Sequence, residues 1–351
     1  MSSLLPFLTI TPLTTHTYSA SFPQDWCIGS VPHGGYITSI FLSVAAKHFQ
    51  TTLSTQNQPD TFILSLNFLR RTSVGPAFLR VRDVKLGRQT SIIHVSLLQG
   101  SEGSSDENEL VEEVCGYITH TNFEAETGPS IETGWSLQPQ APTSKLALAP
   151  TMTEGTLSSA RDPGPAFQHI TTMPFANFRK ATSHLDVWIP TPEARKEAGI
   201  PDGRIDQWLR MRSGEKWTAL HLGYLADCFP LLIEFMEPRT DATAVEADTG
   251  VGNGDADAAS RPAKHWYPTL TLSLDVKKRL PKDGVEWLNV VAQMRVVKNG
   301  RSDLELLIMD TQGDIVAVSH HVSLVVPVER NISKRRSGRV NPLQAAVESK
   351  I

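Results

Sequence analysis

The sequence predicts an α+β protein built from two similar halves, each a long helix followed by a meander of antiparallel strands. Two observations support this prediction. A helix-like apolar segment precedes four strand-like runs in each half of the chain. The turn between the second and third runs also repeats, at residues 86–89 and 299–302, and the Asn299-Gly300 pair is a strong hairpin signal. Pairing the halves edge to edge would give one continuous sheet and would cover the edge that each half exposes alone.

The first half contains one long helix and its meander. Apolar residues recur at helical spacing over residues 34–49, which predicts a helix there. The strand-like runs that follow span residues 62–71, 77–86, 90–99 and 111–122. One more strand is expected before the helix, around residues 15–21.

The second half repeats this order. Its predicted helix spans residues 217–234 and has Leu220, Tyr224, Leu231 and Leu232 among its apolar positions. In the segment 269–275, leucines alternate with polar residues. This alternation predicts a strand with one buried face and one polar face. The runs span residues 269–277, 286–297, 303–310 and 314–326, with a further strand expected around 206–212.

Three stretches of low hydrophobicity are predicted to be linkers or loops, because they have little to bury. Residues 124–165 are rich in Gly, Pro, Ser and Thr, residues 238–263 are rich in Ala, Gly and Asp, and residues 328–351 form a polar tail. The halves therefore fall at residues 1–123 and 205–327, with residues 124–204 as a linker or insert.

Composition excludes several classes of protein. The chain has 351 residues, of which 40% are hydrophobic and 20% charged, which is typical of a globular protein with a sizeable core. The net charge of −4 argues against a nucleic-acid binder that relies on phosphate contacts. No apolar run reaches the ~18 residues of a membrane-spanning helix. Cys27, Cys115 and Cys228 form no CxxC pair, which favours a reducing compartment.

The two ends of the chain bear on its location. The sequence ends in Ser349-Lys350-Ile351, which resembles the small-basic-aliphatic tripeptide read by the peroxisomal import receptor. We therefore expect peroxisomal import through that receptor, and a cytoplasmic location if the tripeptide is a chance match. No basic segment precedes the apolar residues at the N-terminus, so we expect no secretory signal.

Asp227 stands out among the acidic residues because it lies in an otherwise apolar stretch, residues 224–230, in the middle of the predicted second helix. A buried carboxylate needs hydrogen-bond partners or a raised pKa. Either condition suits a general base that activates water. The alternative is a helix cap or an exposed helical position.

Four segments, in their order and spacing, resemble acyl-CoA thioesterase II enzymes and their fungal thioesterase-like relatives, which have a double hotdog fold. They are the glycine-rich entry to the first helix, the strand segment that follows it, the second helix with its acid, and the last hairpin: residues 26–36, 67–70, 222–227 and 312–321. The resemblance covers roughly residues 14–123 and 205–327. It implies hydrolysis of an acyl-CoA or an acyl-carrier thioester to free acid and thiol, without a cofactor or metal, by a chain that pairs into a homo-oligomer.

The resemblance also implies site residues. In the family the acid matching Asp227 works with a Thr and a Gln to hold the attacking water. The Thr position falls on Ser273, which keeps the hydroxyl, and the Gln position falls on His321, which departs from the family and could itself act as base. His320 should face the opposite way, and a slip of one residue in the register would exchange the two histidines.

The helix start at Gly34 and Gly35 is the second part of the implied site. Its free backbone N–H groups could receive the thioester oxygen as it becomes an oxyanion, and the alternative is close packing that needs small residues. His33 is interpreted as structural or pocket-lining. The first helix contains no acid, so we expect one site per chain, at the seam of the halves.

Other chemistries are less well supported. The sequence has no GxSxG elbow, no HExxH and no other metal-ligand spacing. Two alternatives stay open: a hotdog hydratase or dehydratase, for which His221 is the near-sequence partner of Asp227, and a non-catalytic acyl-thioester-binding or biosynthetic accessory protein. Binding of CoA phosphates would need cations, for which Arg70, Arg71 and Lys277 are candidates.

Overall fold

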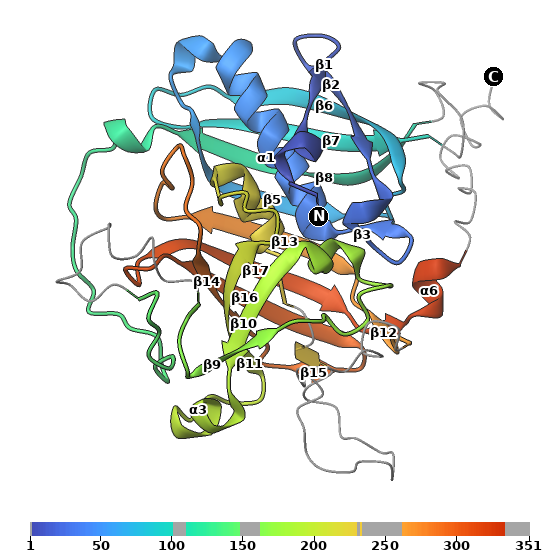
Figure 1. The fold of residues 1–351 in the computed structure, drawn as a ribbon. Coiled ribbons are helices and arrows are strands. Elements are labelled where there is room, and N and C mark those ends of the chain that lie inside the picture. The colour runs from blue at the N-terminus through green and yellow to red at the C-terminus, as the bar shows by residue number, and fades with distance from the viewer. Residues whose placement is uncertain (1, 101–109, 148–161, 230–231, 234–261, 334–351) are drawn as a thin grey trace.

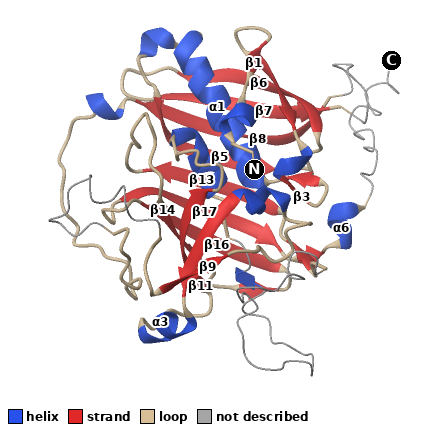
Figure 2. Cartoon of the chain, viewed as in Figure 1, coloured by secondary structure: helices blue, strands red, loops and turns tan. Residues whose placement is uncertain are grey.

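The computed structural model describes residues 2–100, 110–147, 162–229, 232–233 and 262–333. Within them, one 14-stranded antiparallel sheet runs through the whole molecule, and helix α1 lies against one face of its strands (Figure 1, Figure 2). The strand order is β1-β2-β6-β7-β8-β5-β13-β17-β16-β14-β11-β10-β9, with β15 paired to β16. The predicted arrangement, two helix-plus-sheet repeats in one continuous sheet, is confirmed.

The first half follows its predicted order. Its helix α1 and its strands have the bounds β1 (Thr11–Pro12), β2 (Thr17–Phe22), β3 (Cys27–Ile28), β4 (Val31–Pro32), α1 (Gly34–Thr51), β5 (Asp60–Phe68), β6 (Gly75–Lys85), β7 (Ser91–Gln99) and β8 (Val111–Thr121). Short 3-10 turns lie at Leu5–Leu8, Gln24–Trp26, Ser54–Gln56 and Phe123–Ala125.

The second half repeats this order, so that β11, β14, β16, β17 and β13 correspond to β2, β6, β7, β8 and β5. Its elements have the bounds β11 (Arg204–Met211), η7 (Ala219–His221), α4 (Leu222–Leu225), β12 (His265–Trp266), β13 (Thr269–Val276), β14 (Leu288–Gln293), β15 (Val297–Lys298), β16 (Arg301–Met309), β17 (Ile315–Leu324), β18 (Val326–Pro327) and α6 (Glu329–Ile332).

The halves join where β5 pairs antiparallel with β13. Leu66 lies opposite Leu272, and Leu64 lies opposite Leu274. All four leucines are buried beneath the helices. The edge that each half would expose alone is thus covered by its partner half.

Helices α1 and α4 touch through glycines. A Cβ atom added to Gly35 would lie 2.6 Å from the Tyr224 carbonyl oxygen, and one added to Gly223 would lie 2.5 Å from the Ser39 nitrogen. Only residues without side chains let two backbones approach so closely. Because α1 is enclosed by both the sheet and α4, it is buried on almost all sides, which explains its apolar sequence.

The second helix is shorter than predicted. Trp217 forms a bridge with Val285, α4 ends at Leu225, and helical structure appears again at residues 232–233. After Leu225 the chain tightens into a turn, in which the Asp227 and Cys228 N–H groups donate to carbonyl oxygens three residues earlier. Asp227 therefore lies in the turn after α4 and not in mid-helix.

The segment 124–204, predicted as a linker or insert, extends the sheet. It contains β9 (Phe167–Ile170), a 3-10 turn at Lys180–His184, β10 (Leu185–Pro190) and α3 (Pro192–Glu197). β10 pairs with β11 and its side chains are mostly buried, so this apolar run has the core that a loop would lack.

The tail predicted from residue 328 also begins with structure. α6 docks through the buried Asn331, whose side chain donates to the Ile28 carbonyl and accepts from the Ser30 N–H. The tripeptide Ser349-Lys350-Ile351 and most of the predicted loop 238–263 lie outside the described residues. No helix in the described part of the chain is long and apolar enough to cross a membrane.

Candidate active site

A cavity of about 310 Å³ lies at the seam, between the start of α1, the turn after α4, and the facing ends of β5 and β13. Its lining is mainly apolar, with a few polar groups. The apolar part includes Val31, Phe68, Leu69, Phe229, Trp266 and Leu270, and the polar part includes His33, Arg70, Arg71, Arg179, Asp227 and Arg330.

Asp227 lines this cavity although its side chain is only 6% exposed. Its Oδ2 accepts a 2.8 Å hydrogen bond from the Gly35 N–H, at the start of α1. Burial raises the pKa of Asp227 to about 7, although the Gly35 hydrogen bond acts in the opposite direction. The carboxyl group thus changes charge close to neutral pH.

His321 extends from β17 toward Asp227 and is completely buried. Its Nε2 lies 2.6 Å from the Ala226 carbonyl oxygen, which can only accept a hydrogen bond, so Nε2 carries the proton. The other ring nitrogen, Nδ1, then has a free lone pair and lies 3.6 Å from Asp227 Oδ1. Burial lowers the pKa of His321 to about 3, so the ring is neutral at ordinary pH.

Asp227 Oδ1 and His321 Nδ1 are both buried, and neither has a hydrogen-bond partner in the described part of the chain. Their separation of 3.6 Å is too long for a direct hydrogen bond. Two unpartnered acceptors side by side are costly in a protein interior. A water molecule has the two protons that would satisfy both atoms at once.

His33 precedes α1, and its Nε2 lies 3.5 Å from Asp227 Oδ2. Burial lowers its pKa to about 4, against the effect of a hydrogen bond with the Asp227 backbone. The next residue, Gly34, lines the cavity, and its N–H makes no hydrogen bond within the described residues. A Cβ atom at Gly34 would lie 2.7 Å from Asp227 Oδ2, so a side chain there would displace the carboxylate.

The fold therefore brings together five of the six site residues expected from the sequence: His33, Gly34, Gly35, Asp227 and His321. Gly35 differs from expectation, because its N–H is occupied by Asp227 and is not free for an oxyanion. Its packing role is against α4. Only Gly34 keeps the free N–H that was expected of both glycines.

Ser273 is the residue that the fold does not bring to the site. It lies opposite His320 in the β13–β17 ladder, whereas the buried His321 lies opposite Leu272. Because side chains of neighbouring ladder partners share a face, Ser273 and the exposed His320 point away from Asp227. The structure therefore does not bring Ser273 to Asp227 as expected, and it places His320 on the face opposite His321.

Other expected partners are placed elsewhere. His221 lies 3.5 Å from Glu215 and caps its own turn through Thr218, so it does not act with Asp227. Lys277 pairs with Asp275 and does not line the cavity. Arg71 donates to the carbonyl oxygens of residues 330, 331 and 333, and so holds α6 beside the cavity.

Arg179 is a site residue that the sequence reasoning missed. It lines the cavity from the segment treated as a linker, with its guanidinium over the rings of Phe175 and Tyr267. Its position depends on the fold of that segment, and no local sequence signal marks it.

Comparisons with known proteins agree with this architecture. Family models described as the acyl-CoA thioesterase N-terminal domain and C-terminal domain match residues 22–121 and 156–325. The thioesterase-like protein TwmA of Talaromyces wortmannii is 33% identical over 335 residues, which is 92% of each chain.

Solved structures are similar in fold at low identity. An acyl-CoA thioesterase II, TesB2, from Mycobacterium marinum superposes with a TM-score of 0.57 at 15% identity, over 93% of this chain and 98% of that chain. A protein with a hotdog fold from Alicyclobacillus acidocaldarius gives a TM-score of 0.57 at 14% identity, with the same coverage.

Proposed function

The chain belongs to the acyl-CoA thioesterase family and is a thioesterase-like hydrolase. From this premise we propose that it hydrolyses an acyl-CoA or a related acyl thioester. In this proposal the attacking water molecule is held between Asp227 and His321. The observation that carries the proposal is the unpartnered pair, Asp227 Oδ1 and His321 Nδ1, 3.6 Å apart beside the cavity. A water that donates one proton to each atom turns its lone pairs toward the substrate.

Asp227 is the base in this mechanism. Its pKa of about 7 suits proton transfer near neutral pH, whereas His321, with a pKa of about 3, accepts a hydrogen bond but takes no proton. Gly35 holds Oδ2, so that Oδ1 keeps its direction. His321 therefore orients the water that Asp227 deprotonates.

The reaction forms one bond and breaks another. The water oxygen bonds to the thioester carbon, its proton passes to Asp227 Oδ1, and the carbonyl oxygen becomes an oxyanion. The free N–H of Gly34, at the positive end of α1, is the donor for this oxyanion. The oxyanion then re-forms the carbonyl as the C–S bond breaks. The leaving sulfur takes the proton from Asp227 Oδ1 and departs as the free thiol.

The cavity lining supports the choice of substrate class. Its apolar side chains suit an acyl chain, and its volume of about 310 Å³ is in the range of small-ligand sites. Arg70, Arg179 and Arg330 line the same cavity, and these cations suit the phosphates of CoA or of a carrier-bound thioester.

A second candidate is hydration of a 2-enoyl thioester. One observation favours it: the neutral His33 lies 3.5 Å from Asp227, so a histidine and a carboxyl group flank the same cavity. Such a reaction would use the pair for proton transfer at carbon and would leave the thioester intact.

The test is free-thiol release from a panel of acyl-CoAs, short to long, branched and aromatic, with enoyl-CoA consumption followed in parallel. We expect thiol release from some member and a loss of about 10²–10⁴-fold in kcat/KM for Asp227→Asn, the usual range for a general base. Asparagine still offers an oxygen to the Gly35 N–H, so the fold should persist, which thermal unfolding checks.

Each other outcome changes the assignment. Enoyl-CoA consumption without thiol release would establish the hydratase. Substrate binding without turnover would indicate an accessory protein. Thiol release that persists in Asp227→Asn would keep the hydrolase and exclude Asp227 as its base.

A further inference from the structure

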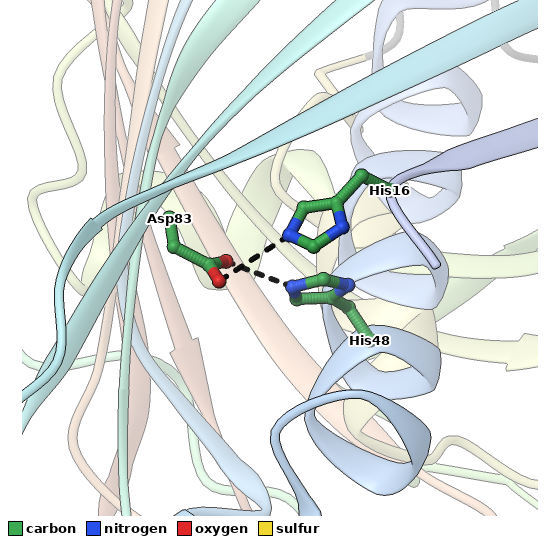
Figure 3. Close-up of side chains that lie close together, drawn as sticks. All are labelled: His16, His48 and Asp83. Atoms are coloured by element: carbon green, nitrogen blue, oxygen red, sulfur yellow. Dashed lines mark hydrogen bonds and ion pairs between the residues drawn. The ribbon is translucent and has the colours of Figure 1, made fainter. Parts of the chain in front are cut away.

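A second cluster of titratable side chains lies near the opposite end of α1. His48 lies in the last turns of that helix, His16 in the segment just before β2, and Asp83 in β6. Figure 3 shows the two imidazole rings directed at the same carboxylate from separate elements. The proposed hydrolysis uses none of the three.

The donor atoms of this cluster converge on one point. His48 Nε2 lies 2.9 Å from Asp83 Oδ1, and His16 Nε2 lies 3.3 Å from Asp83 Oδ2. All the donor atoms lie within 4.8 Å of one another. Ligand atoms bound to a single zinc ion are separated by about 3.3 Å, given metal–ligand distances near 2.0–2.1 Å. Small side-chain shifts would therefore place one ion between them.

Each histidine is also fixed through its other ring nitrogen. His48 Nδ1 lies 2.9 Å from the Tyr18 hydroxyl, and His16 Nδ1 lies 2.9 Å from Thr15 Oγ1. The Asp83 carboxylate can only accept, so in this structure His48 Nε2–H donates to it, and His48 Nδ1 faces the Tyr18 hydroxyl. An ion that replaced the Nε2 proton would leave the proton on Nδ1, and Nδ1–H would then donate to the Tyr18 hydroxyl as the outer hydrogen bond of a metal-ligating histidine.

We propose that His16, His48 and Asp83 bind a divalent transition metal ion, with zinc as the expected occupant and solvent in the remaining position. Two imidazoles and a carboxylate suit zinc in both ligand type and number. His16 is 42% exposed and Asp83 26%, so an ion can reach the site from solvent, while His48 is buried. The ion would link three separate elements of the first half.

Cobalt(II) is the probe for this site, because its visible absorption reports the ligand geometry. The experiment uses the full chain without an affinity tag, stripped by a chelator and then titrated with Co²⁺ and with competing Zn²⁺. We expect one equivalent of Co²⁺ with ligand-field bands, displaced by Zn²⁺, and a rise in Tm on Zn²⁺ addition.

Two variants separate ligation from folding. His16→Ala removes a ligand that is partly exposed, so the fold should persist, and it should weaken Co²⁺ binding on the order of a hundredfold or more. Tyr18→Phe keeps the ring and removes the outer hydrogen bond, and should weaken binding about 10–100-fold.

His169→Ala is the matched control, because His169 also faces an aspartate, Asp186, but lacks a second histidine there. It should bind Co²⁺ as the wild type does. The proposal is overturned if the wild type gives no ligand-field bands, if His16→Ala retains them, or if His169→Ala loses them. Because the readout is metal binding, it does not depend on the proposed hydrolysis.

Discussion

Two histidines and an aspartate from different segments meet near each end of helix α1, and the two clusters differ in exposure and geometry. At its start, the nitrogens of His33 and His321 lie 3.5 and 3.6 Å from the oxygens of Asp227, with all three side chains at most 7% exposed. At its end, the corresponding distances to Asp83 are 3.3 and 2.9 Å, and two of the three side chains are partly exposed.

This difference decides what each cluster can do. In the buried cluster, desolvation raises the pKa of Asp227 to about 7 and lowers those of His33 and His321 to about 4 and 3, so the neutral forms are favoured. Such an environment suits the proton transfer that we propose for Asp227. In the exposed cluster, two imidazole nitrogens and a carboxylate lie within 4.8 Å of one another, a set of atoms that suits a cation once the ring protons are displaced. Environment, rather than residue type, separates the two functions.

The largest expected effect is in the pH profile of the hydrolase. If Asp227 is the base, kcat/KM should rise with pH through an apparent pKa of about 7 and then level off. Activity at pH 5 should be roughly fiftyfold below that at pH 7, because only the ionised carboxylate accepts the proton. Initial rates of thiol release from pH 5 to 9 check this, with circular dichroism at each pH as the control for folding. A flat profile would contradict the assignment.

The next effect concerns His321, for which we propose that it holds the water without taking its proton. His321→Ala should lower kcat about 10–100-fold with the pH profile unchanged, because the water loses one of its two acceptors. His321→Gln, with an amide oxygen in reach of the same position, should recover part of the loss. If His321→Ala removed the rise near pH 7, the histidine and not Asp227 would be the base.

A smaller effect is expected from the exposed cluster. Asp83→Asn should leave kcat/KM within about twofold of the wild type, because the helical rise from His33 to His48 separates the clusters by about 22 Å. It should abolish the Zn²⁺-dependent rise in Tm. Paired kinetics and thermal unfolding, with and without Zn²⁺, measure both. A large loss of activity would mean that the two ends of α1 are coupled.

The smallest effect should come from Ser273→Ala. The serine faces away from Asp227, beside the exposed His320, so both kcat and Tm should stay close to the wild-type values. Thiol-release kinetics at saturating and limiting substrate are sufficient. A tenfold loss of kcat would restore Ser273 to the site and would require a different register for β13.

Sequence reasoning worked where a pattern is local. The two helices, the strand runs and the isolated acid Asp227 each leave a signal in adjacent residues. In β13 the buried Leu272 and Leu274 alternate with Ser273, so the alternation alone predicts that Ser273 lies on the other face of the strand. The resemblance to the family pointed instead to Ser273 as a site residue.

The rest depends on contacts between distant segments. His16, His48 and Asp83 come from three elements, with no spacing that identifies a ligand set. Arg179 reaches the cavity from residues 124–204, which were predicted to be a linker or insert. No local pattern could predict these positions, because only the tertiary fold brings them together.

The reciprocal glycine contact between α1 and α4 has a consequence for symmetry. The segments His33-Gly34-Gly35-Tyr36 and His221-Leu222-Gly223-Tyr224 occupy equivalent positions, and Ser39 stands where the repeat would carry the counterpart of Asp227. In a dimer of identical chains related by a twofold axis, any substitution at one of these positions would occur in both copies. In this single chain one repeat has Asp227 and the other has Ser39, so the two copies of one scaffold can carry different groups, and the proposed reaction needs the acid in one copy alone.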